Sequence, residues 1–256
     1  MFALLIGVGV LTGVTTVVFG FGGGFVTVPV VVWANARLGD AAPVTAVATS
    51  AVVMVVNAAI ATASTRPDVL RELRGSTRLL VLLAVGATGG ALAAAHVPAA
   101  LLRWGFVLYL VGTIADLATR PGFLRPHTDP RPRGPVIGSA LGVPIGAVAA
   151  FLGVGGSVLT VPLLRRAGHS MGSATTLANP LTLAIALPST LVFLTATDLP
   201  TGLVDVPAAV ALLAGALPVI LVLRRRPPRI PDRLHARTYL GLLVAVTAAM
   251  AVTNLV

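Results

Sequence analysis

Two glycine-rich segments of this sequence contain the residues best suited to binding a small anion. Residues 20–29 read GFGGGFVTVP and residues 153–162 read GVGGSVLTVP, so six of the ten positions are identical. Glycine adopts backbone conformations that end a helix, and the N–H groups at the start of the next helix carry a partial positive charge. Such helix starts bind anions without a charged side chain. We therefore predict that each segment interrupts a helix and directs backbone N–H groups at an anion.

The shared Thr-Val-Pro ending predicts where the second helix of each segment begins. Threonine caps helix starts by accepting a backbone N–H, and proline fits into the first helical turn. We therefore expect Thr27 and Thr160 to be N-caps, with short helices that begin at Val28 and Val161. Threonine in membrane helices also bonds to its own backbone, which is the alternative role for each hydroxyl.

Further hydroxyl and amide side chains follow each glycine segment. Val-Ala-Thr-Ser at residues 47–50 corresponds to Ser-Ala-Thr-Thr at residues 173–176. Asn57 and Asn179 also lie in apolar runs, and we favour Asn179 because it precedes Pro180 close to the second hydroxyl pair. The predicted substrate-binding residues are Gly22, Gly23, Gly24, Thr27, Thr49, Ser50, Gly155, Gly156, Ser157, Thr160, Thr175, Thr176 and Asn179.

The remaining reactive side chains give few signs of other chemistry. Asp116 is a carboxylate inside an apolar segment, which makes it the candidate for proton coupling, with an ion pair to Arg120 as the alternative. The histidines lie in or beside loops without a His-Glu-x-x-His spacing, so we expect no metal site and no cofactor. A serine protease built on Ser157 and His169 would lack an acid to orient the histidine, so we expect no enzyme.

The composition indicates a membrane protein whose main partner is the lipid bilayer. The chain has 256 residues, of which 56% are hydrophobic and only 10% charged, whereas soluble domains carry about 25% charged residues. The net charge of +10 comes from arginines that lie between apolar runs, so they indicate membrane topology rather than nucleic-acid binding. The absence of cysteine excludes disulfides and thiol chemistry. Residues 1–19 lack a basic n-region, so we interpret them as a retained membrane segment.

The lengths of the apolar runs and the positions of the arginines together predict the topology. Runs 1–36 and 134–164 would form helices of about 45–55 Å against a hydrocarbon core of about 30 Å, so each is predicted to be a broken, re-entrant hairpin. If residues 134–164 return to their own side, sixteen arginines fall on one side and two on the other, which marks the arginine-bearing side as cytoplasmic. The remaining predicted transmembrane helices are 41–65, 79–102, 101–118, 172–197, 203–223 and 238–256.

We therefore predict an all-α polytopic membrane protein built from two inverted repeats. Residues 1–118 and 134–256 would each form a broken hairpin followed by three transmembrane helices, joined by a cytoplasmic linker at 119–133, with both termini outside. Transporters of this architecture bind their substrates between interrupted helices near the bilayer midplane. An anion channel, or a non-transporting scaffold whose glycines only pack helices, are the alternatives.

The twin Gly-x-Gly-Gly-[Gly/Ser]-x-x-x-Val-Pro motifs, each followed by an Ala-Thr-Ser-like helix start, resemble those of the sulfite exporter TauE/SafE family. The resemblance spans nearly the whole chain and implies export of small sulfur-containing anions, such as sulfite or organosulfonates, across a bacterial inner membrane. Its signature positions are Gly22, Gly23, Gly24, Pro29, Gly155, Gly156 and Pro162. Ser157 stands where glycine is common, Thr175-Thr176 replaces Thr-Ser, and Asn179-Pro180 interrupts an apolar helix, so the substrate stays open. The transport direction, the coupling ion and a homodimeric state also stay open.

Overall fold

The computed structural model describes residues 1–124, 137–195 and 203–255, and every regular element in these ranges is helical. The longer helices are α1 (Phe2–Phe19), α2 (Gly24–Ala34), α3 (Ala42–Ala63), α5 (Thr77–His96), α6 (Ala99–Thr119), α7 (Gly142–Leu152), α8 (Ser157–Arg166), α9 (Met171–Thr195), α10 (Val206–Arg225) and α11 (Asp232–Leu255). The short elements are η1 (Ala36–Ala41), α4 (Pro67–Leu70), η2 (Arg71–Leu73) and η3 (Ser139–Leu141). The prediction of an all-α chain is confirmed; most of the predicted linker lies outside the described residues.

Seven of the described helices are long and apolar enough to cross a membrane: α1, α3, α5, α6, α9, α10 and α11. The sequence predicted six full crossings, because α1 was assigned to a re-entrant hairpin. The additional candidate is α1 itself, whose 18 apolar residues precede the glycine break. Its counterpart α7 has only 11 residues, so the first arms of the two hairpins differ in length.

Glycines in the left-handed backbone region end α1 and α7. Gly20 has φ 74° and Gly153 has φ 66°, a region that residues with a Cβ seldom enter. The N–H groups of Gly20 and Phe21 donate to the carbonyls of α1 at 3.2 and 3.4 Å, and Gly153 and Val154 do the same for α7 at 3.3 and 3.1 Å. Both helices therefore end in the same type of C-cap, and the chain reverses direction at each.

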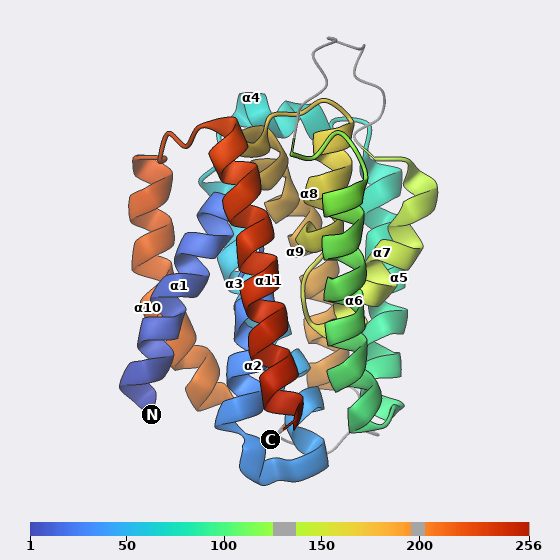
Figure 1. The fold of residues 1–256 in the computed structure, drawn as a ribbon, viewed down its shortest axis with the longest axis vertical. Helices are drawn as coiled ribbons and strands as arrows, with labels where there is room; N and C mark the ends of the chain where they lie inside the picture. The colour runs from blue at the N-terminus through green and yellow to red at the C-terminus, as the bar shows by residue number, and fades with distance from the viewer. Residues whose placement is uncertain (125–136, 196–202, 256) are drawn as a thin grey trace.

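The two hairpins enter the molecule from opposite ends (Figure 1). The amino terminus and the end of α2 lie at the lower end of the view, whereas α7 begins and α8 ends at the upper end. Helices α3, α5, α6, α9, α10 and α11 run between the two ends, and the carboxyl terminus lies at the same end as the amino terminus. The hairpins thus place both glycine breaks in the interior of the helical bundle.

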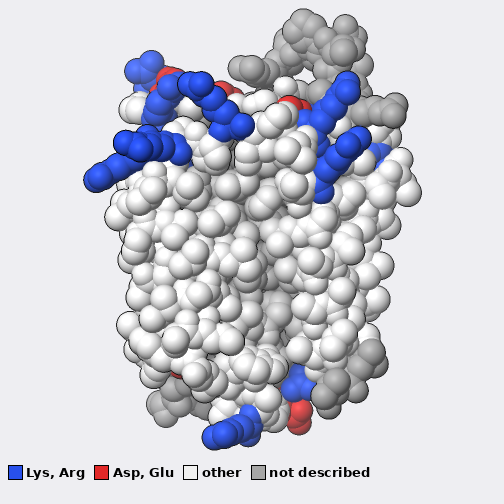
Figure 2. Space-filling view, turned by 60° about the vertical axis from the view of Figure 1, so that its left-hand side comes forward, with Lys and Arg blue, Asp and Glu red and all other residues white. Residues whose placement is uncertain are grey.

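Positive charge gathers at one end of the molecule, which we call the arginine-rich end (Figure 2). The α3–α5 and α10–α11 connections and the carboxyl ends of α6 and α8 lie at this end (Figure 1). A wide band of uncharged residues separates it from the opposite end (Figure 2). Arg120 Nε and Arg166 Nη2 both bond to the Asp116 carboxylate, at 3.1 and 2.6 Å. The chain segments that contain these two arginines therefore lie at the same end, as the re-entrant second hairpin requires.

Close helix packing joins the two predicted repeats to each other. Helix α1 packs against α10, α7 packs against α5, and α3 and α9 pack together. A Cβ added to Gly9 of α1 would lie 2.2 Å from the Leu212 carbonyl oxygen, and one added to Gly86 of α5 would lie 2.1 Å from that of Val143. Small residues allow helix backbones to approach this closely. Each first arm therefore rests on a helix of the other half of the sequence.

Candidate functional site

The two glycine breaks meet inside the bundle. Ser50 Oγ on α3 donates a hydrogen bond of 2.8 Å to the carbonyl oxygen of Gly153, which belongs to the second break. A Cβ added to Gly24 would lie 2.6 Å from that same oxygen, and one added to Gly155 would lie 3.4 Å from the Phe21 carbonyl oxygen. Segments more than one hundred residues apart in the sequence therefore form one buried centre.

Helices α2 and α8 both begin at this centre. Within α2 the N–H groups of Val26 and Thr27 donate to the Gly23 carbonyl at 3.2 and 3.0 Å. The N–H groups of Gly24 and Phe25 come before these first hydrogen bonds of the helix. Leu159 and Thr160 of α8 donate in the same way to Gly156, at 3.1 and 2.8 Å. The N–H groups in the first turn of a helix have no partner within the helix, so they are available to a ligand. The helix dipole favours a negatively charged ligand at this position.

The predicted N-caps are wrong by several residues. Helix α2 begins at Gly24 with Gly23 as its N-cap at φ 97°, and α8 begins at Ser157, so Thr27 and Thr160 lie inside the helices. Thr27 Oγ1 instead donates to the carbonyl of Gly23 at 2.9 Å. Pro29 and Pro162 likewise lie inside the helices rather than in their first turns. The glycines allow the chain to turn and start a helix earlier than a threonine cap would.

Several buried polar atoms around this centre have no hydrogen-bond partner among the described residues. They are Ser157 Oγ, Thr160 Oγ1, Asn57 Oδ1, Asn179 Oδ1 and Thr182 Oγ1. Buried polar groups are normally satisfied, because an unmet hydrogen bond costs about 1–3 kcal/mol. The grouping of such atoms around two helix amino termini indicates a place where a polar ligand completes the bonding.

The two asparagines contact the centre differently. Asn57 Nδ2 donates to the Gly22 carbonyl at 3.3 Å, so this side chain bonds directly to the first break. Asn179 Nδ2 donates to the carbonyl of Thr175 in its own helix at 3.2 Å. Asn57, which the sequence left open, therefore lies at least as near the breaks as Asn179, and both retain a free amide oxygen.

Sequence reasoning missed Thr182 and Met54, which also line the breaks. The Thr182 methyl group lies 2.8 Å from a Cβ built on Gly22 and 3.1 Å from one built on Gly155. Met54 Sδ lies 2.3 Å from a Cβ on Gly24 and 3.0 Å from one on Gly155. The signal for Thr182 was present, since it follows Thr175 by seven residues and therefore shares its helix face.

The predicted hydroxyl residues of α3 and α9 are not brought together. Thr49 Oγ1 accepts a hydrogen bond of 2.9 Å from the Asp205 N–H, and Asn35 Nδ2 donates to the Asp205 carboxylate at 2.8 Å, toward the opposite end. Thr175 and Thr176 donate to the carbonyl of Gly172, at 3.2 and 2.8 Å, and lie near the arginine-rich end. The structure thus places Ser50 at the breaks, with Thr49 on one side of them and Thr175 and Thr176 on the other.

Asp116 lies away from the breaks. Its carboxylate joins α6 to α8 through Arg166 and pairs with Arg120 along α6. It also lines a groove between α6, α7 and α8. This geometry corresponds to the ion-pair alternative, while proton coupling remains a prediction.

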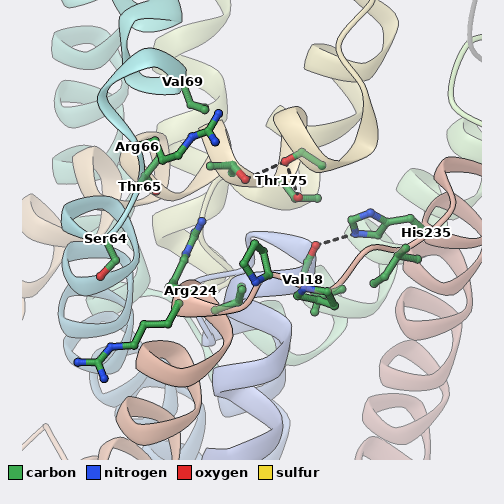
Figure 3. A pocket seen from close by; sticks show the side chains of 15 residues that line it. Val18, Ser64, Thr65, Arg66, Val69, Thr175, Arg224 and His235 are labelled. Atoms are coloured by element: carbon green, nitrogen blue, oxygen red, sulfur yellow. Dashed lines mark hydrogen bonds between the residues drawn. The ribbon is translucent and has the colours of Figure 1, made fainter.

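A cavity of about 470 Å³ lies at the arginine-rich end, and we call it the arginine-end cavity (Figure 3). Its lining includes Val18 of α1, Thr65 and Arg66 after α3, Thr175 and Thr176 of α9, Arg224 and Arg225 of α10, and His235 of α11. Arg66 bonds to Asp68 at 2.8 Å and thereby holds the pKa of that carboxyl below its ordinary value. His235 Nε2 lies 2.7 Å from the Val18 carbonyl oxygen, the contact drawn as a dashed line in Figure 3.

The fold and this buried polar centre define the class of the protein. A bundle with seven membrane-length helices, interrupted by two paired helix breaks, is a multi-pass helical membrane protein of the transporter type. The sulfite exporter TauE/SafE family model matches residues 5–250, so this chain belongs to that family of membrane transporters. No curated protein and no solved structure matches the chain.

Proposed function

We propose that this protein is a secondary transporter that exports small sulfur-containing anions, such as sulfite or organosulfonates, across the bacterial inner membrane. One observation carries the proposal: the starts of α2 and α8 lie at a single buried centre, among polar atoms that have no hydrogen-bond partner in the described ranges. Backbone N–H groups supply the positive potential there, while hydroxyl and amide groups supply orientation. The family match supplies the substrate class.

The two halves would work as inverted repeats around this centre. Corresponding helices of the two halves make corresponding contacts, which supports such a relation. Helix α1 packs on α10 as α7 packs on α5, and α2 packs on α3 as α8 packs on α9. Rocking of the hairpins against the other helices would expose the anion first to one side of the membrane and then to the other. The arginine-rich end would face the cytoplasm, as the positive-inside rule expects.

Flux into proteoliposomes tests this function. The purified protein is reconstituted and offered sulfite, thiosulfate, sulfoacetate, taurine and chloride in turn. We expect saturable flux of sulfite or a sulfonate, with little flux of chloride. Non-saturating flux with single-channel currents would instead support an anion channel, and the absence of flux for every anion would support a non-transporting scaffold.

A further inference from the structure

Arg224 lines the arginine-end cavity and has no ion-pair or hydrogen-bond partner in the part of the chain that the structure describes. Its Nε and Nη2 atoms are buried and have no hydrogen-bond partner among the described residues. Arg66, another arginine of the cavity, pairs with Asp68 at 2.8 Å. Arg224 is half-buried, and burying guanidinium N–H groups without hydrogen-bond acceptors is costly. This cost falls when an anion accepts their hydrogen bonds.

Hydroxyl groups and the first helix break lie beside this cation. Thr175 and Thr176 line the same cavity, on the α9 side. A Cβ added to Gly20 would lie 2.3 Å from the Thr175 carbonyl oxygen, so this wall of the cavity is in contact with the first break. The cavity therefore lies next to Gly20, the residue at which the first break begins.

We infer that the arginine-end cavity is an anion-binding site, with Arg224 as its charge partner. The ligand class is a small oxyanion with two or more oxygens on one atom, because the planar guanidinium fork binds such groups through two parallel hydrogen bonds. The Thr175 and Thr176 hydroxyls, which now donate to the Gly172 carbonyl, reach such an anion by rotation about χ1. This inference deepens the proposed function and rests on it, since the site would receive the anion before the glycine breaks do.

Binding of sulfite to the purified full-length protein in nanodiscs tests this assignment. Isothermal titration compares the parent protein with Arg224→Gln, Arg224→Lys and Arg226→Gln. Arg226 is the matched control, because it lies two residues along the same helix end, is exposed and does not line the cavity. Size-exclusion elution and thermal unfolding establish that each variant is folded, and Arg224→Lys keeps the charge if Arg224→Gln unfolds.

We expect Arg224→Gln to raise the Kd for sulfite at least tenfold, Arg224→Lys to raise it less, and Arg226→Gln to leave it within twofold. An unchanged Kd in Arg224→Gln would overturn the assignment while leaving the proposed function intact. An equal loss of sulfite affinity in Arg224→Gln and Arg226→Gln would also overturn the assignment, because it would show that the positive surface potential of this end attracts the anion without a specific site. Absence of sulfite binding and flux in the parent protein would remove the proposed function as well.

A lipid headgroup could supply the same oxyanion chemistry, so the titration is repeated in two bilayers. One contains only phosphatidylcholine, and the other contains an added anionic lipid, phosphatidylglycerol. Equal sulfite affinity in both bilayers supports a site for a soluble anion. In the phosphatidylglycerol bilayer, the parent protein could bind sulfite more weakly while Arg224→Gln shows no such difference between bilayers. That result would show that the anionic lipid headgroup occupies the cavity, which would overturn its role for the transported anion.

Discussion

Ser50 on α3 donates a hydrogen bond of 2.8 Å to the carbonyl oxygen of Gly153 at the break between α7 and α8. This contact joins a helix of the first half of the chain to the re-entrant hairpin of the second half. It also fixes the position of a carbonyl group that approaches Gly24 of the first break. One buried hydroxyl therefore links a helix of the first half of the chain directly to the second break.

Ser50→Ala should lower both stability and transport. The variant leaves the Gly153 carbonyl without its donor, which we expect to cost about 1 kcal/mol and roughly 2–4 °C in unfolding temperature. Thermal unfolding in detergent measures the effect. Thr195→Ala is the control, because Thr195 is exposed and its hydroxyl donates to the Leu191 carbonyl of its own helix. Equal effects of the two substitutions would show that the Ser50 contact has no special role.

Gly24→Ala and Gly156→Ala should differ strongly, although both glycines belong to the glycine breaks and Gly156 aligns with Gly23, the neighbour of Gly24. An added Cβ at Gly24 meets Met54 Sδ at 2.3 Å and the immobile Gly153 carbonyl at 2.6 Å, whereas at Gly156 the only close atom is the flexible end of Ile185, at 2.4 Å. We expect Gly24→Ala to lose about 1–3 kcal/mol of stability and most transport, and Gly156→Ala to lose less than about 1 kcal/mol. Thermal unfolding and proteoliposome flux provide the two measurements. Comparable damage from both would contradict the packing described for the breaks.

Thr182→Val should weaken anion binding without reducing stability. The Thr182 hydroxyl is buried beside both breaks and has no partner among the described residues, while its methyl group makes the packing contacts. Replacing an unpartnered hydroxyl by a methyl group removes no hydrogen bond of the free protein. We expect an unchanged or slightly higher unfolding temperature and a several-fold higher half-saturation concentration for sulfite. An unchanged half-saturation concentration would remove Thr182 from the site.

Asp116→Asn should leave the dependence of transport on an imposed pH gradient unchanged. The carboxylate pairs with Arg120 and Arg166 at the arginine-rich end rather than facing the breaks, so its replacement should cost about 0.5–1 kcal/mol of stability. Uptake into inverted vesicles under an imposed pH gradient measures the coupling. Loss of pH-driven uptake with sulfite binding preserved would establish Asp116 as the proton-coupling residue.

Cysteine labelling should report the two ends of the molecule separately. The natural sequence contains no cysteine, so single-cysteine variants need no background removal. Arg71 is exposed in η2, which belongs to the α3–α5 connection at the arginine-rich end. Arg37 is exposed in η1, which follows α2 at the opposite end. We expect an impermeant maleimide to label Arg37→Cys in intact cells, but Arg71→Cys only after the cells are permeabilised. The reverse pattern would invert the proposed orientation.

The sequence alone predicted the features that depend on local chemistry and on the bilayer. Gly20 and Gly153 end helices because they occupy positive φ, and the membrane-length runs appear as helices because an unpaired backbone is costly in lipid. The arginine count on each side predicted that Arg120 and Arg166 share one end. The helix starts at Gly24 and Ser157 were missed, because capping rules favour threonine where glycine geometry sets the boundary.

Tertiary structure alone decided which of the polar residues share a site. It joins Ser50 to Gly153 and brings Thr182 to both breaks, while it directs Thr49 toward Asp205 at the opposite end. It also places Arg224 in a cavity that no motif predicted, with no hydrogen-bond partner among the residues that the structure describes. These relationships join residues far apart in the chain, and they depend on how closely glycine-faced helices pack, which periodicity and composition do not specify.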